Sequence, residues 1–522
     1  MTLVAVLQIV SIAVWAIYAG RKLIKSMHML QLNSYRNLRL WNWYMGNFKR
    51  TIRVMDVLPI VPLILFAMDK PLWGHIAWIA AFLLLTLTVP KEIEKKKLVY
   101  TARVKRLLTT TAILLVVLVG ALLPWTPFAA LAMYAVTLLP AVFILLANTV
   151  NKPIEHQINN YYINDARKKI ERHASTQVIG ITGSFGKTSV KHFLSTVLSQ
   201  SYHVLMTPES YNTPMGVTKT IRTYLQPTHE IFISEMGAKQ KGDIKEICDI
   251  VHPKYGIITA IGEQHLETFK SLENVKATKF ELAEALPADG VAFLNLDDEN
   301  VADQLRKSNL RCKVVTYGSR NPDTDYYAEN VRYSRNGCAF AVRVRNGAVQ
   351  EFETALLGEH NIQNLLACIA VGDTLGIPLP KLAMYIRKVK PVKHRLELKK
   401  NGNLTILDDS FNSNPVGSKA ALAVLAQMPE KKILVTPGMI ELGAKEYEYN
   451  YAFAEAAAKV CDYIILVGPK QTKPMQDALQ AAGYANFRVA KHLQEGLQFL
   501  QGFANEHTVV LLENDLPDNY NE

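Results

Sequence analysis

The stretch QVIGITGSFGKTSV, residues 177–190, decides how the second part of this chain folds. A short apolar run leads into a loop with Gly183 and Gly186, after which Lys187 and Thr188 begin a segment with helical spacing. A strand, a glycine-rich loop and a helix in this order are typical of phosphate binding, because backbone N–H groups at a helix N-terminus can surround an oligophosphate. We expect Lys187 to reach the terminal phosphates and the Thr188 hydroxyl to complete the shell of a magnesium ion.

The loop departs from the strict nucleotide-binding spacing, because Ile181 stands where the first glycine is required. The match is the variant T-G-S-F-G-K-T at 182–188, in which Ser184 and Phe185 lie between the glycines. A glycine-rich turn without a ligand would explain two glycines, but it would not explain a Lys-Thr pair at the head of a helix. We therefore predict that this loop binds the phosphates of a nucleotide.

The positive charge of the chain is concentrated in its first 150 residues. They contain 16 Lys and Arg residues and four acidic residues, and this difference equals the net charge of +12 of the whole chain. The basic residues lie between apolar segments, which indicates membrane topology rather than a surface for nucleic acid. We therefore expect a membrane as a partner and no nucleic acid.

Five apolar runs predict an α-helical transmembrane domain over residues 1–150, since most of them approach the roughly 20 residues that cross a bilayer. The segments 21–53 and 91–106 are rich in Lys and Arg and are expected on the cytoplasmic side. Five spans would place the N-terminus outside and residue 151 inside. We therefore expect an integral protein of the inner (cell) membrane with cytoplasmic catalytic domains. The runs cover residues 3–19, 54–68, 72–89, 107–125 and 128–150.

A smaller number of spans is the alternative for this region, with one or two crossing helices and the other runs buried or interfacial. The run 54–68 is short and contains Pro59 and Pro62, which disfavour a continuous helix. The segment 27–48 carries two tryptophans among basic residues, and it predicts an amphipathic helix at the membrane interface.

The rest of the chain predicts two α/β domains after a polar linker helix at 151–175. Over 176–390, apolar strand-like runs alternate with amphipathic stretches, which predicts a central domain with a mostly parallel, helix-covered sheet. Short alternating stretches after Thr316 predict an antiparallel excursion of that sheet. Residues 391–522 predict a smaller, Rossmann-like α/β domain. All five cysteines lie in these domains without C-x-x-C spacing, so we expect free thiols in a reducing compartment.

Polar residues follow the predicted strands of the central domain where ligands bind in such sheets. Glu235 and His265 come at the ends of two strands, and together with Thr188 they are expected to converge on magnesium. The simpler interpretations are a carboxylate at a helix start and a surface histidine. Asn361 and Asn364 lie one helical turn apart, so they are expected either to read an adenine edge or to cap a helix.

Eight motifs in a fixed order over 176–522 resemble the Mur ligases, and among these the MurF type that adds D-alanyl-D-alanine to the peptidoglycan stem peptide. The resemblance implies a P-loop central domain, a Rossmann-like C-terminal domain and an ATP- and Mg²⁺-dependent amide ligase. A substrate carboxylate would attack the γ-phosphate to form an acyl phosphate, and an incoming amine would displace the phosphate. The motifs are TGSFGKTS, EMGAKQKGDI, GEQHLETFKS, KATKFEL, GEHNIQN, HRLE, DDSFNSNP and GMIELG.

The resemblance also implies catalytic roles for Lys187, Glu235, His265, Lys279 and Arg395. It assigns Lys187 to the transferring phosphoryl group, and it places Thr188 and Glu235 on one magnesium ion and His265 on a second. Lys279 of KATKFEL falls where related ligases have a lysine, carbamylated in several of them, that serves the second metal. An ordinary helix lysine is the alternative for Lys279.

The nucleotide contacts implied by the resemblance come from both α/β domains. Asn361 and Asn364 would contact adenine. Arg395 would reach the γ-phosphate from the C-terminal domain, and Asp409 would bind the ribose with Phe411 nearby. Because Arg395 and Asp409 lie far from the loop in sequence, we expect the two domains to close over ATP and exclude water.

The chain departs from the MurF pattern where the substrates would bind. Ordinary MurF enzymes begin with a soluble domain for the uridine diphosphate sugar, whereas residues 1–150 here resemble a membrane bundle. A lipid-linked muramyl peptide at the inner leaflet is therefore one expected acceptor, with Asn212 and Thr213 in the family's loop near the sugar. Asn450 stands where a histidine is common, which leaves the amine donor, an amino acid or a dipeptide, open.

Three other functions remain as alternatives. A membrane-tethered ligase for another polymer, such as poly-γ-glutamate, belongs to the same class. A nucleotide-driven transporter or sensor belongs to a different class, but the chain lacks the LSGGQ signature of one such group. A degenerate ligase that only holds an envelope-synthesis complex together would have no chemical need for Lys187, Glu235, His265, Lys279 and Arg395.

Overall fold

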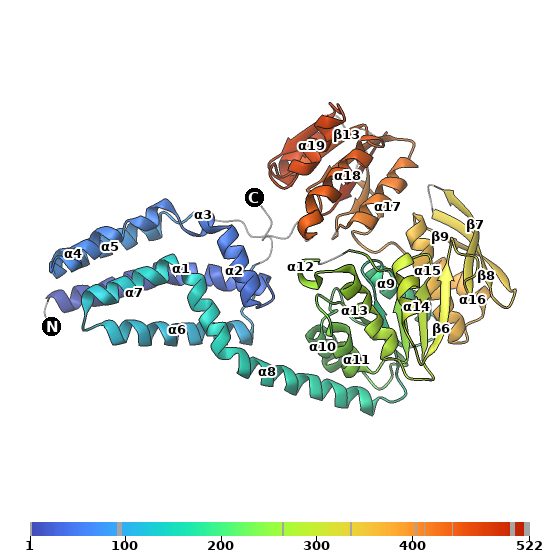
Figure 1. Ribbon diagram of the computed structural model, residues 1–522, viewed down its shortest axis with the longest axis horizontal. Coiled ribbons are helices and arrows are strands. Elements are labelled where there is room, and N and C mark those ends of the chain that lie inside the picture. Colours follow the sequence, from blue (N-terminus) through green and yellow to red (C-terminus); the bar gives the residue numbers. More distant parts are fainter. Residues whose placement is uncertain are drawn as a thin grey trace. The chain divides into compact units, whose positions relative to one another are not determined.

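The computed structural model describes residues 3–90, 97–263, 266–334, 337–401, 404–411, 413–440, 442–501 and 507–515. The chain falls into two units, one that ends at Asn160 and one that begins at Tyr161. Figure 1 labels their helices and strands.

The first unit is helical, as its long apolar runs predict. Its core contains fully buried aromatic side chains such as Trp78 and Phe82, which pack with Tyr18 of the first helix. Most of the large apolar side chains that are exposed in the described residues also belong to this unit. Its elements are α1 (Leu3–Leu32), α2 (Asn37–Gly46), α3 (Phe48–Thr51), the 3-10 turn η1 (Val54–Val57), α4 (Ile60–Ala67), α5 (Pro71–Leu87), α6 (Ala102–Leu122), α7 (Thr126–Leu138) and α8 (Pro140–Arg172), which continues into the second unit.

By length and composition, the described residues do not contain five separate helices that could each cross a membrane. By length and composition α1 and α6 are able to cross a membrane, and α7 with α8 would add a third span if this pair, bent by 88°, is counted as one. The run 54–68 is divided at Pro59 into a 3-10 turn and a helix of only 8 residues. Helix α5, with 17 residues, lies at the lower limit of spanning length. By length and composition, two or three of the five predicted spans are therefore supported, because Pro59 divides one run and α5 is short.

The second unit contains a nine-stranded sheet that is parallel from β2 to β7 and antiparallel from β7 to β9. The strand order is β2-β3-β1-β4-β5-β6-β7-β8-β9. The strands are β1 (Gln177–Thr182), β2 (Val204–Met206), β3 (Ile231–Glu235), β4 (Tyr255–Ile258), β5 (Val291–Asn295), β6 (Lys313–Gly318), β7 (Tyr326–Ser334), β8 (Gly337–Val344) and β9 (Val349–Thr354).

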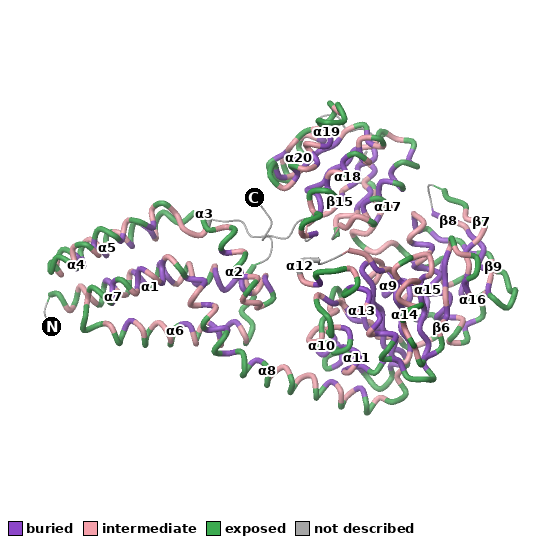
Figure 2. Tube along the Cα trace, in the orientation of Figure 1, coloured by how far each residue is buried: buried purple, intermediate pink, exposed green. Residues whose placement is uncertain are grey.

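Successive side chains along the strands point to opposite faces of this sheet, so a hydrophobic core lies on each face. Ile179 and Ile233 face a core shared with α9 and α15, whereas Val178 and Phe232 face a core shared with α11 and α13. Figure 2 shows buried residues running through these strands and helices. The helices of this domain are α9 (Lys187–Leu198), α10 (Pro214–Tyr224), α11 (Asp243–Val251), α12 (Leu266–Phe269), α13 (Leu272–Glu284), α14 (Glu299–Lys307), α15 (Glu359–Thr374) and α16 (Leu379–Ile386).

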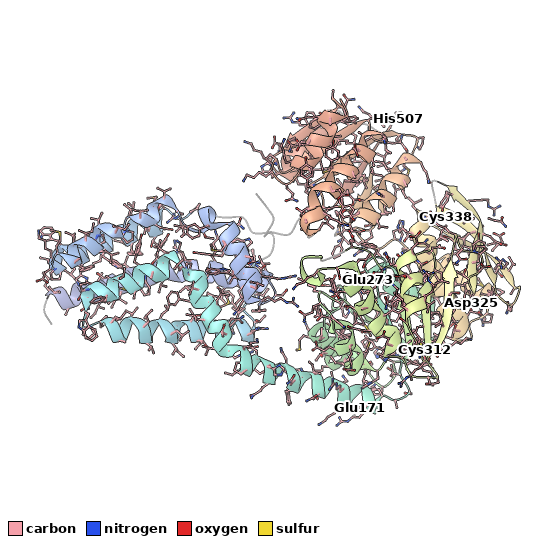
Figure 3. All side chains as sticks on the ribbon, viewed as in Figure 1. Glu171, Glu273, Cys312, Asp325, Cys338 and His507 are labelled. Atoms are coloured by element: carbon pink, nitrogen blue, oxygen red, sulfur yellow. The ribbon has the colours of Figure 1, made fainter. Side chains whose placement is uncertain are left out.

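The predicted antiparallel excursion is present as β7, β8 and β9. Asp325, labelled in Figure 3, accepts hydrogen bonds from the backbone N–H and the hydroxyl of Thr316, each at 2.8 Å. This carboxylate ties the start of β7 to β6 where the sheet changes from parallel to antiparallel pairing. All five cysteines are free and buried, as expected from their spacing; Cys312 and Cys338 are labelled in Figure 3.

A second, six-stranded sheet has the order β10-β11-β15-β12-β13-β14, in which only β10 is antiparallel. The prediction of two α/β domains with mostly parallel sheets is thus confirmed. The strands are β10 (Glu397–Asn401), β11 (Leu404–Asp409), β12 (Lys431–Thr436), β13 (Tyr463–Val467), β14 (Phe487–Ala490) and β15 (Thr508–Glu513). The helices are α17 (Pro415–Ala426), α18 (Glu446–Ala458), α19 (Lys473–Ala481) and α20 (Leu493–Gln501), with a 3-10 turn η2 (Gly443–Lys445).

Candidate active site

Strand β1 lies between β3 and β4 and pairs with both in parallel. The segments that follow these three strands therefore leave the same edge of the sheet. They are the glycine loop after β1, Glu235 at the end of β3, and the residues from Thr259 onward after β4. This edge is where ligands bind in open parallel sheets.

The loop between β1 and α9 requires glycine because its φ angles are positive and because neighbouring atoms leave no room for a Cβ atom. Gly183 and Gly186 have φ angles of 150° and 80°, which side-chain-bearing residues rarely adopt. A Cβ atom at Gly186 would lie 2.7 Å from Oδ1 of Asn364. The hydroxyl of Thr259 donates to the carbonyl of Phe185 and holds the loop. The result is a shaped cradle at the N-terminus of a 12-residue helix, which suits a phosphate group.

Lys187 is the first residue of α9, and its side chain reaches back to the loop. Nζ donates to the carbonyl oxygens of Gly183 at 2.6 Å and Ser184 at 3.1 Å. Burial lowers the pKa of Lys187 to about 8; the charge of Glu235 opposes this shift and that of Arg395 adds to it. A phosphate beside Nζ would raise this pKa, because a nearby opposite charge favours the ammonium form.

Glu235 is buried at the end of β3 and is surrounded by donors. Oε1 accepts from the Thr188 hydroxyl and from Nδ2 of Asn212, both at 3.1 Å. Oε2 lies 3.0 Å from Nζ of Lys191, whose side chain is also fully buried. Burial alone would raise the pKa of Glu235, but Lys191 and Lys187 outweigh it and hold this pKa below its usual range. The carboxylate is therefore ionised beside the loop.

Lys191 was not predicted from the sequence. It lies one helical turn after Lys187 on α9, and its ammonium also donates to the backbone carbonyl of Glu209. The repeated lysine at i and i+4, in KTSVK, is the signal that would have placed both side chains on one helix face.

Four residues at the start of α15, His360, Asn361, Gln363 and Asn364, line a pocket together with Lys187 and Glu235. Asn361 donates through Nδ2 to the carbonyl of Leu357 at 2.8 Å, and Asn364 lies 3.4 Å from Oδ1 of Asn361. Their neighbour His360 was not predicted. Burial lowers the pKa of His360 to about 4, and its Nδ1 has no hydrogen-bond partner among the described residues. A neutral imidazole with a free nitrogen is suited to a polar ligand atom.

The smaller domain contributes Arg395 from a strained segment. The flanking residues His394 and Leu396 have φ angles of 62° and 46°, in the left-handed region. The guanidinium carbon lies 4.7 Å from the ring centroid of Phe411, and burial lowers the pKa of Arg395. Oδ1 of Asp409 accepts from the backbone N–H of Leu396 at 3.1 Å, which holds the arginine segment against β11.

Asp409 and Glu513 form a buried carboxyl pair on neighbouring strands. They are register partners in β11 and β15. Burial raises the pKa of Asp409 to about 6 against the opposing charge of Arg395. Burial, with the charge of Asp409, raises the pKa of Glu513 well above its usual range. Glu513, which also accepts a hydrogen bond from Ser413, is therefore the protonated member; it was missed because only the tertiary pairing brings it to the site.

The structure brings most of the predicted site residues into one pocket of the second unit. The predicted residues that line it are Ser184, Phe185, Gly186, Lys187, Thr188, Asn212, Glu235, Asn361, Asn364, Arg395, Asp409 and Phe411.

Three other predicted residues do not line this pocket, and a fourth lies outside the described residues. Gly183 contributes its carbonyl to Lys187 rather than lining the pocket, and Thr213 caps α10 by accepting from the N–H of Gly216 at 3.2 Å. Lys279 is buried on α13; burial lowers its pKa well below the usual value, and the charge of Lys187 adds to this. His265 lies outside the described residues.

The donor set fits magnesium better than a softer metal. Within the described ranges, no group of three or more His, Cys, Asp or Glu side chains could hold a metal ion. Glu235 and the Thr188 hydroxyl instead supply two hard oxygen atoms beside the phosphate cradle. Mg²⁺ bound with phosphate oxygens and water needs few protein ligands, so this pair of oxygens is sufficient.

Asn450, which stands where related ligases often have a histidine, is fully buried and structural here. Its Oδ1 accepts from the N–H of Met439 at 2.8 Å, and its Nδ2 donates to the carbonyl of the same residue at 2.9 Å. The asparagine thus holds the backbone of the GMIELG segment.

Two family profiles match the second unit. The Mur ligase middle domain matches residues 181–372, and the Mur ligase, glutamate ligase domain matches residues 394–513. UDP-N-acetylmuramoyl-tripeptide–D-alanyl-D-alanine ligase of Escherichia coli K12 is 30% identical over 338 residues, 63% of this chain and 74% of that protein. The enzyme of the same name from Bacillus subtilis 168 is 34% identical over 278 residues, 53% of this chain and 59% of that protein.

Solved structures show the same fold. MurF from Acinetobacter baumannii superimposes with a TM-score of 0.63 at 24% identity and covers 69% of this chain and 78% of that one. MurF from Thermotoga maritima, in complex with ADP, gives a TM-score of 0.62 at 22% identity over 68% of this chain and 80% of that one. From the ordered motifs, the phosphate cradle and these relatives, the chain belongs to the Mur ligase family of ATP- and Mg²⁺-dependent peptide ligases, with relatives of the MurF type.

Proposed function

We propose that this protein is a membrane-anchored, MurF-like ligase that joins an amine to a carboxylate of a cell-wall precursor. The observation that carries the proposal is the meeting of Lys187, Glu235 and Arg395 in one pocket. These residues come from two domains and are the charges that a phosphoryl transfer requires. A transporter would not need an arginine and a carboxyl pair on a second α/β domain at this place.

Bound ATP would supply the phosphoryl group that turns the substrate carboxylate into an acyl phosphate, and magnesium would neutralise charge on the phosphates. A carboxylate oxygen attacks the γ-phosphorus and the bond to the ADP oxygen breaks. The amine then attacks the acyl carbon, phosphate leaves, and the amine loses a proton. Lys187 and Arg395 neutralise charge on the transferring group, since such transfer depends on positioning and electrostatic stabilisation. Glu235 and Thr188 hold the magnesium, and Asn361, Asn364, Asp409 and Phe411 position the nucleoside.

Lys279 is proposed as a carbamylated lysine that serves the second magnesium together with His265. A carbamate forms from a neutral amine, and the burial that lowers the pKa of Lys279 favours that form. Intact-mass spectrometry of active protein under native conditions tests the modification, with Lys279→Gln as the unmodified control. An active sample in which Lys279 carries no added mass contradicts this part of the proposal.

Membrane anchoring is supported by the first unit. Helices α1 and α6 have spanning length, and apolar side chains such as Ile9 and Val116 are 58% and 73% exposed. Apolar surface of this extent is stable in lipid and unfavourable in water. Fractionation of cells tests the anchor: the protein is expected in membranes after alkaline carbonate washing, and release by that wash contradicts it.

The first unit also supports a lipid-linked acceptor, because it stands before the ligase domains where MurF enzymes have a soluble sugar-nucleotide domain. Purified protein is incubated with ATP, D-Ala-D-Ala and either soluble UDP-muramoyl tripeptide or its lipid-linked form. Preferred turnover of the lipid-linked form is expected, and turnover of the soluble form alone contradicts this proposal.

The amine donor is tested in the same assay. A screen of dipeptides and single amino acids identifies the amine that stimulates phosphate release. D-Ala-D-Ala is the expected donor, as in the names of the relatives. Stimulation by glutamate alone would favour the alternative of a ligase for another polymer.

A further inference from the structure

The first unit contains a basic groove of about 760 Å³ that the proposed ligase chemistry does not use. It lies where the turn after α1, the start of α2, the start of α6 and the middle of α8 meet. Its cationic lining consists of Arg36, Arg103 and Lys152, with His156 beside them. All of these residues belong to the same unit, so the groove is a property of that unit.

Of the three cations in this groove, Arg103 has an acidic residue of the lining as a partner. The only acidic residue in its lining, Glu155, is buried and lies 2.7 Å from Arg106, which is outside the groove, and 3.8 Å from Arg103. Among the described residues, Arg36 and Lys152 have no ion-pair partner. Two cations are thus free to meet an anion.

Amide groups beside the cations form a preset hydrogen-bonding wall. Nδ2 of Asn148 donates to Oδ1 of Asn37 at 2.6 Å and to the carbonyl of Tyr35 at 3.0 Å. Nδ2 of Asn37 donates to the hydroxyl of Thr149 at 3.0 Å. Arg103 stacks over the ring of Tyr35 at 3.9 Å. These contacts fix the positions of groups that would otherwise lose conformational freedom on binding.

The groove lies at the boundary between polar and apolar sequence in two helices. Helix α6 begins with ARVKR and then becomes apolar, whereas α8 is apolar up to Val150 and polar from Asn151. In the proposed membrane anchor this boundary is the level of the lipid headgroups.

Helix α2, at the edge of the groove, presents an apolar stripe outward. Leu38, Trp41 and Met45 are 71%, 39% and 53% exposed and follow helical spacing, while Leu40 and Tyr44 pack inward. Phe48, the first residue of α3, is 44% exposed. A helix with one face in the protein and an apolar outer face that includes Trp is typical of the membrane interface. The stripe would contact acyl chains directly beside the cations (Figure 1 labels α2).

We infer that this groove binds the diphosphate headgroup of a membrane lipid. Unpaired arginine and lysine match the negative charge of a diphosphate, basic pockets beside membrane helices bind phosphate-bearing headgroups, and the apolar stripe receives the chain. A groove of this volume exceeds what one phosphate group needs and leaves room for a polar substituent next to the amide wall. The inference deepens the proposed function, on whose membrane anchor and lipid-linked acceptor it rests.

The test is a titration of the full-length protein in phosphatidylcholine nanodiscs with geranylgeranyl diphosphate, followed by tryptophan fluorescence. Geranylgeraniol, which lacks the diphosphate, and inorganic diphosphate, which lacks the chain, are titrated in parallel. Saturable binding of the lipid diphosphate is expected, with much weaker binding of both partial ligands. Equal binding of inorganic diphosphate would show a free-anion site and contradict the inference.

Variants locate the site. The double variant R36Q/K152Q is expected to weaken binding roughly 30-fold, from about 1 kcal/mol per basic group near a membrane surface. R36K/K152R keeps both charges and should stay within a few-fold of wild type. Lys105→Gln removes an exposed lysine of α6 outside the groove and should leave binding unchanged. Wild-type affinity in R36Q/K152Q overturns the inference.

The same experiment distinguishes a general site for anionic lipids from the proposed diphosphate site, and it is independent of ligase turnover. If nanodiscs with phosphatidylglycerol abolish binding of the lipid diphosphate by competition, the groove is a general anionic-lipid site and the inference is wrong. Because binding is measured without ATP or amine, absence of ligase turnover would contradict the proposed function while leaving this test intact.

Discussion

Lys191 places a buried positive charge 3.0 Å from Glu235, one helical turn beyond Lys187. With Lys187 it outweighs the effect of burial and keeps the carboxylate ionised. A buried ion pair contributes little net stability, but removal of one partner leaves an uncompensated charge. The role of Lys191 is therefore to position Glu235, the proposed magnesium ligand, and to keep it ionised.

Lys191→Met should destabilise the protein by roughly 3–5 kcal/mol, because Glu235 remains buried without its partner. The pKa of Glu235 should rise, so the fall of kcat/KM at acidic pH should begin at a higher pH. Thermal melting and a pH profile of turnover measure the two effects. The double variant K191M/E235Q should recover most of the stability without recovering activity; a double variant as unstable as K191M would contradict the ion-pair account.

Because of the Asp409–Glu513 pair, we expect stability to fall as pH rises, which is the opposite of the usual effect of carboxyl groups. Burial raises the pKa of Asp409 to about 6 and that of Glu513 further, so the folded state binds more protons than the unfolded one. The pair therefore stabilises the fold below the unfolded carboxyl pKa of about 4, and stability is lost as pH rises through the folded values.

Glu513→Gln keeps a neutral donor to Asp409 and removes the group with the more strongly raised pKa. Melting temperature measured from pH 4 to pH 8 should fall less with rising pH in this variant than in wild type. Identical pH slopes in the two proteins would show that Glu513 is not protonated in the fold.

The phosphate loop is the element whose geometry decides nucleotide binding. Gly186 needs its left-handed backbone, and it also needs the space that a Cβ would take from Asn364. Gly347 has a φ angle of 88° with no atom within 4 Å of a built Cβ, so it shares only the first requirement.

Gly186→Ala and Gly347→Ala should each lose roughly 1–2 kcal/mol of stability from the left-handed conformation. Only Gly186→Ala should also weaken ATP binding, because the methyl group displaces Asn364 or the loop. Calorimetric titration with ATP distinguishes the two variants. Equal ATP affinity in both would mean that the close contact with Asn364 does not matter for binding.

The elements that local sequence determines were predictable, and those that depend on tertiary pairing were not. The loop at 182–188 and the strand ending in Glu235 follow from local pattern and chain order. Glu513 and His360 are ordinary in sequence, and they become site residues only through the pairing of β15 with β11 and the packing of α15. By length and composition, fewer than the five predicted spans are supported, because the run with Pro59 is divided and α5 is short.

At the scale of the whole second unit, one bridge joins the two α/β domains near the pocket. Glu263, after β4, lies 2.7 Å from Nζ of Lys445 and accepts a hydrogen bond from Tyr449. Burial alone would raise the pKa of Glu263, but these two partners hold it below its usual range. We expect this bridge to favour closure of the two domains over the nucleotide.

Lys445→Ala combined with Tyr449→Phe should loosen this closure. KM for ATP should rise several-fold, and phosphate release without amine should increase because water reaches the acyl phosphate. Lys473→Ala, which removes the exposed pair with Asp477 on the same domain, is the matched control and should change neither quantity. If the double variant changes neither KM for ATP nor phosphate release without amine, the bridge does not contribute to closure.

The central claim is that Lys187 acts in an amine-dependent, ATP-driven ligation. The most direct measurement is phosphate release by purified wild-type protein and by Lys187→Ala, with ATP, Mg²⁺, a muramyl-peptide acceptor and D-Ala-D-Ala, each omitted in turn. Release in wild type should require both acceptor and amine, and Lys187→Ala should lose at least about 10²-fold of the rate with an unchanged helical content. Turnover that persists in Lys187→Ala, or phosphate release independent of the amine, would contradict the claim.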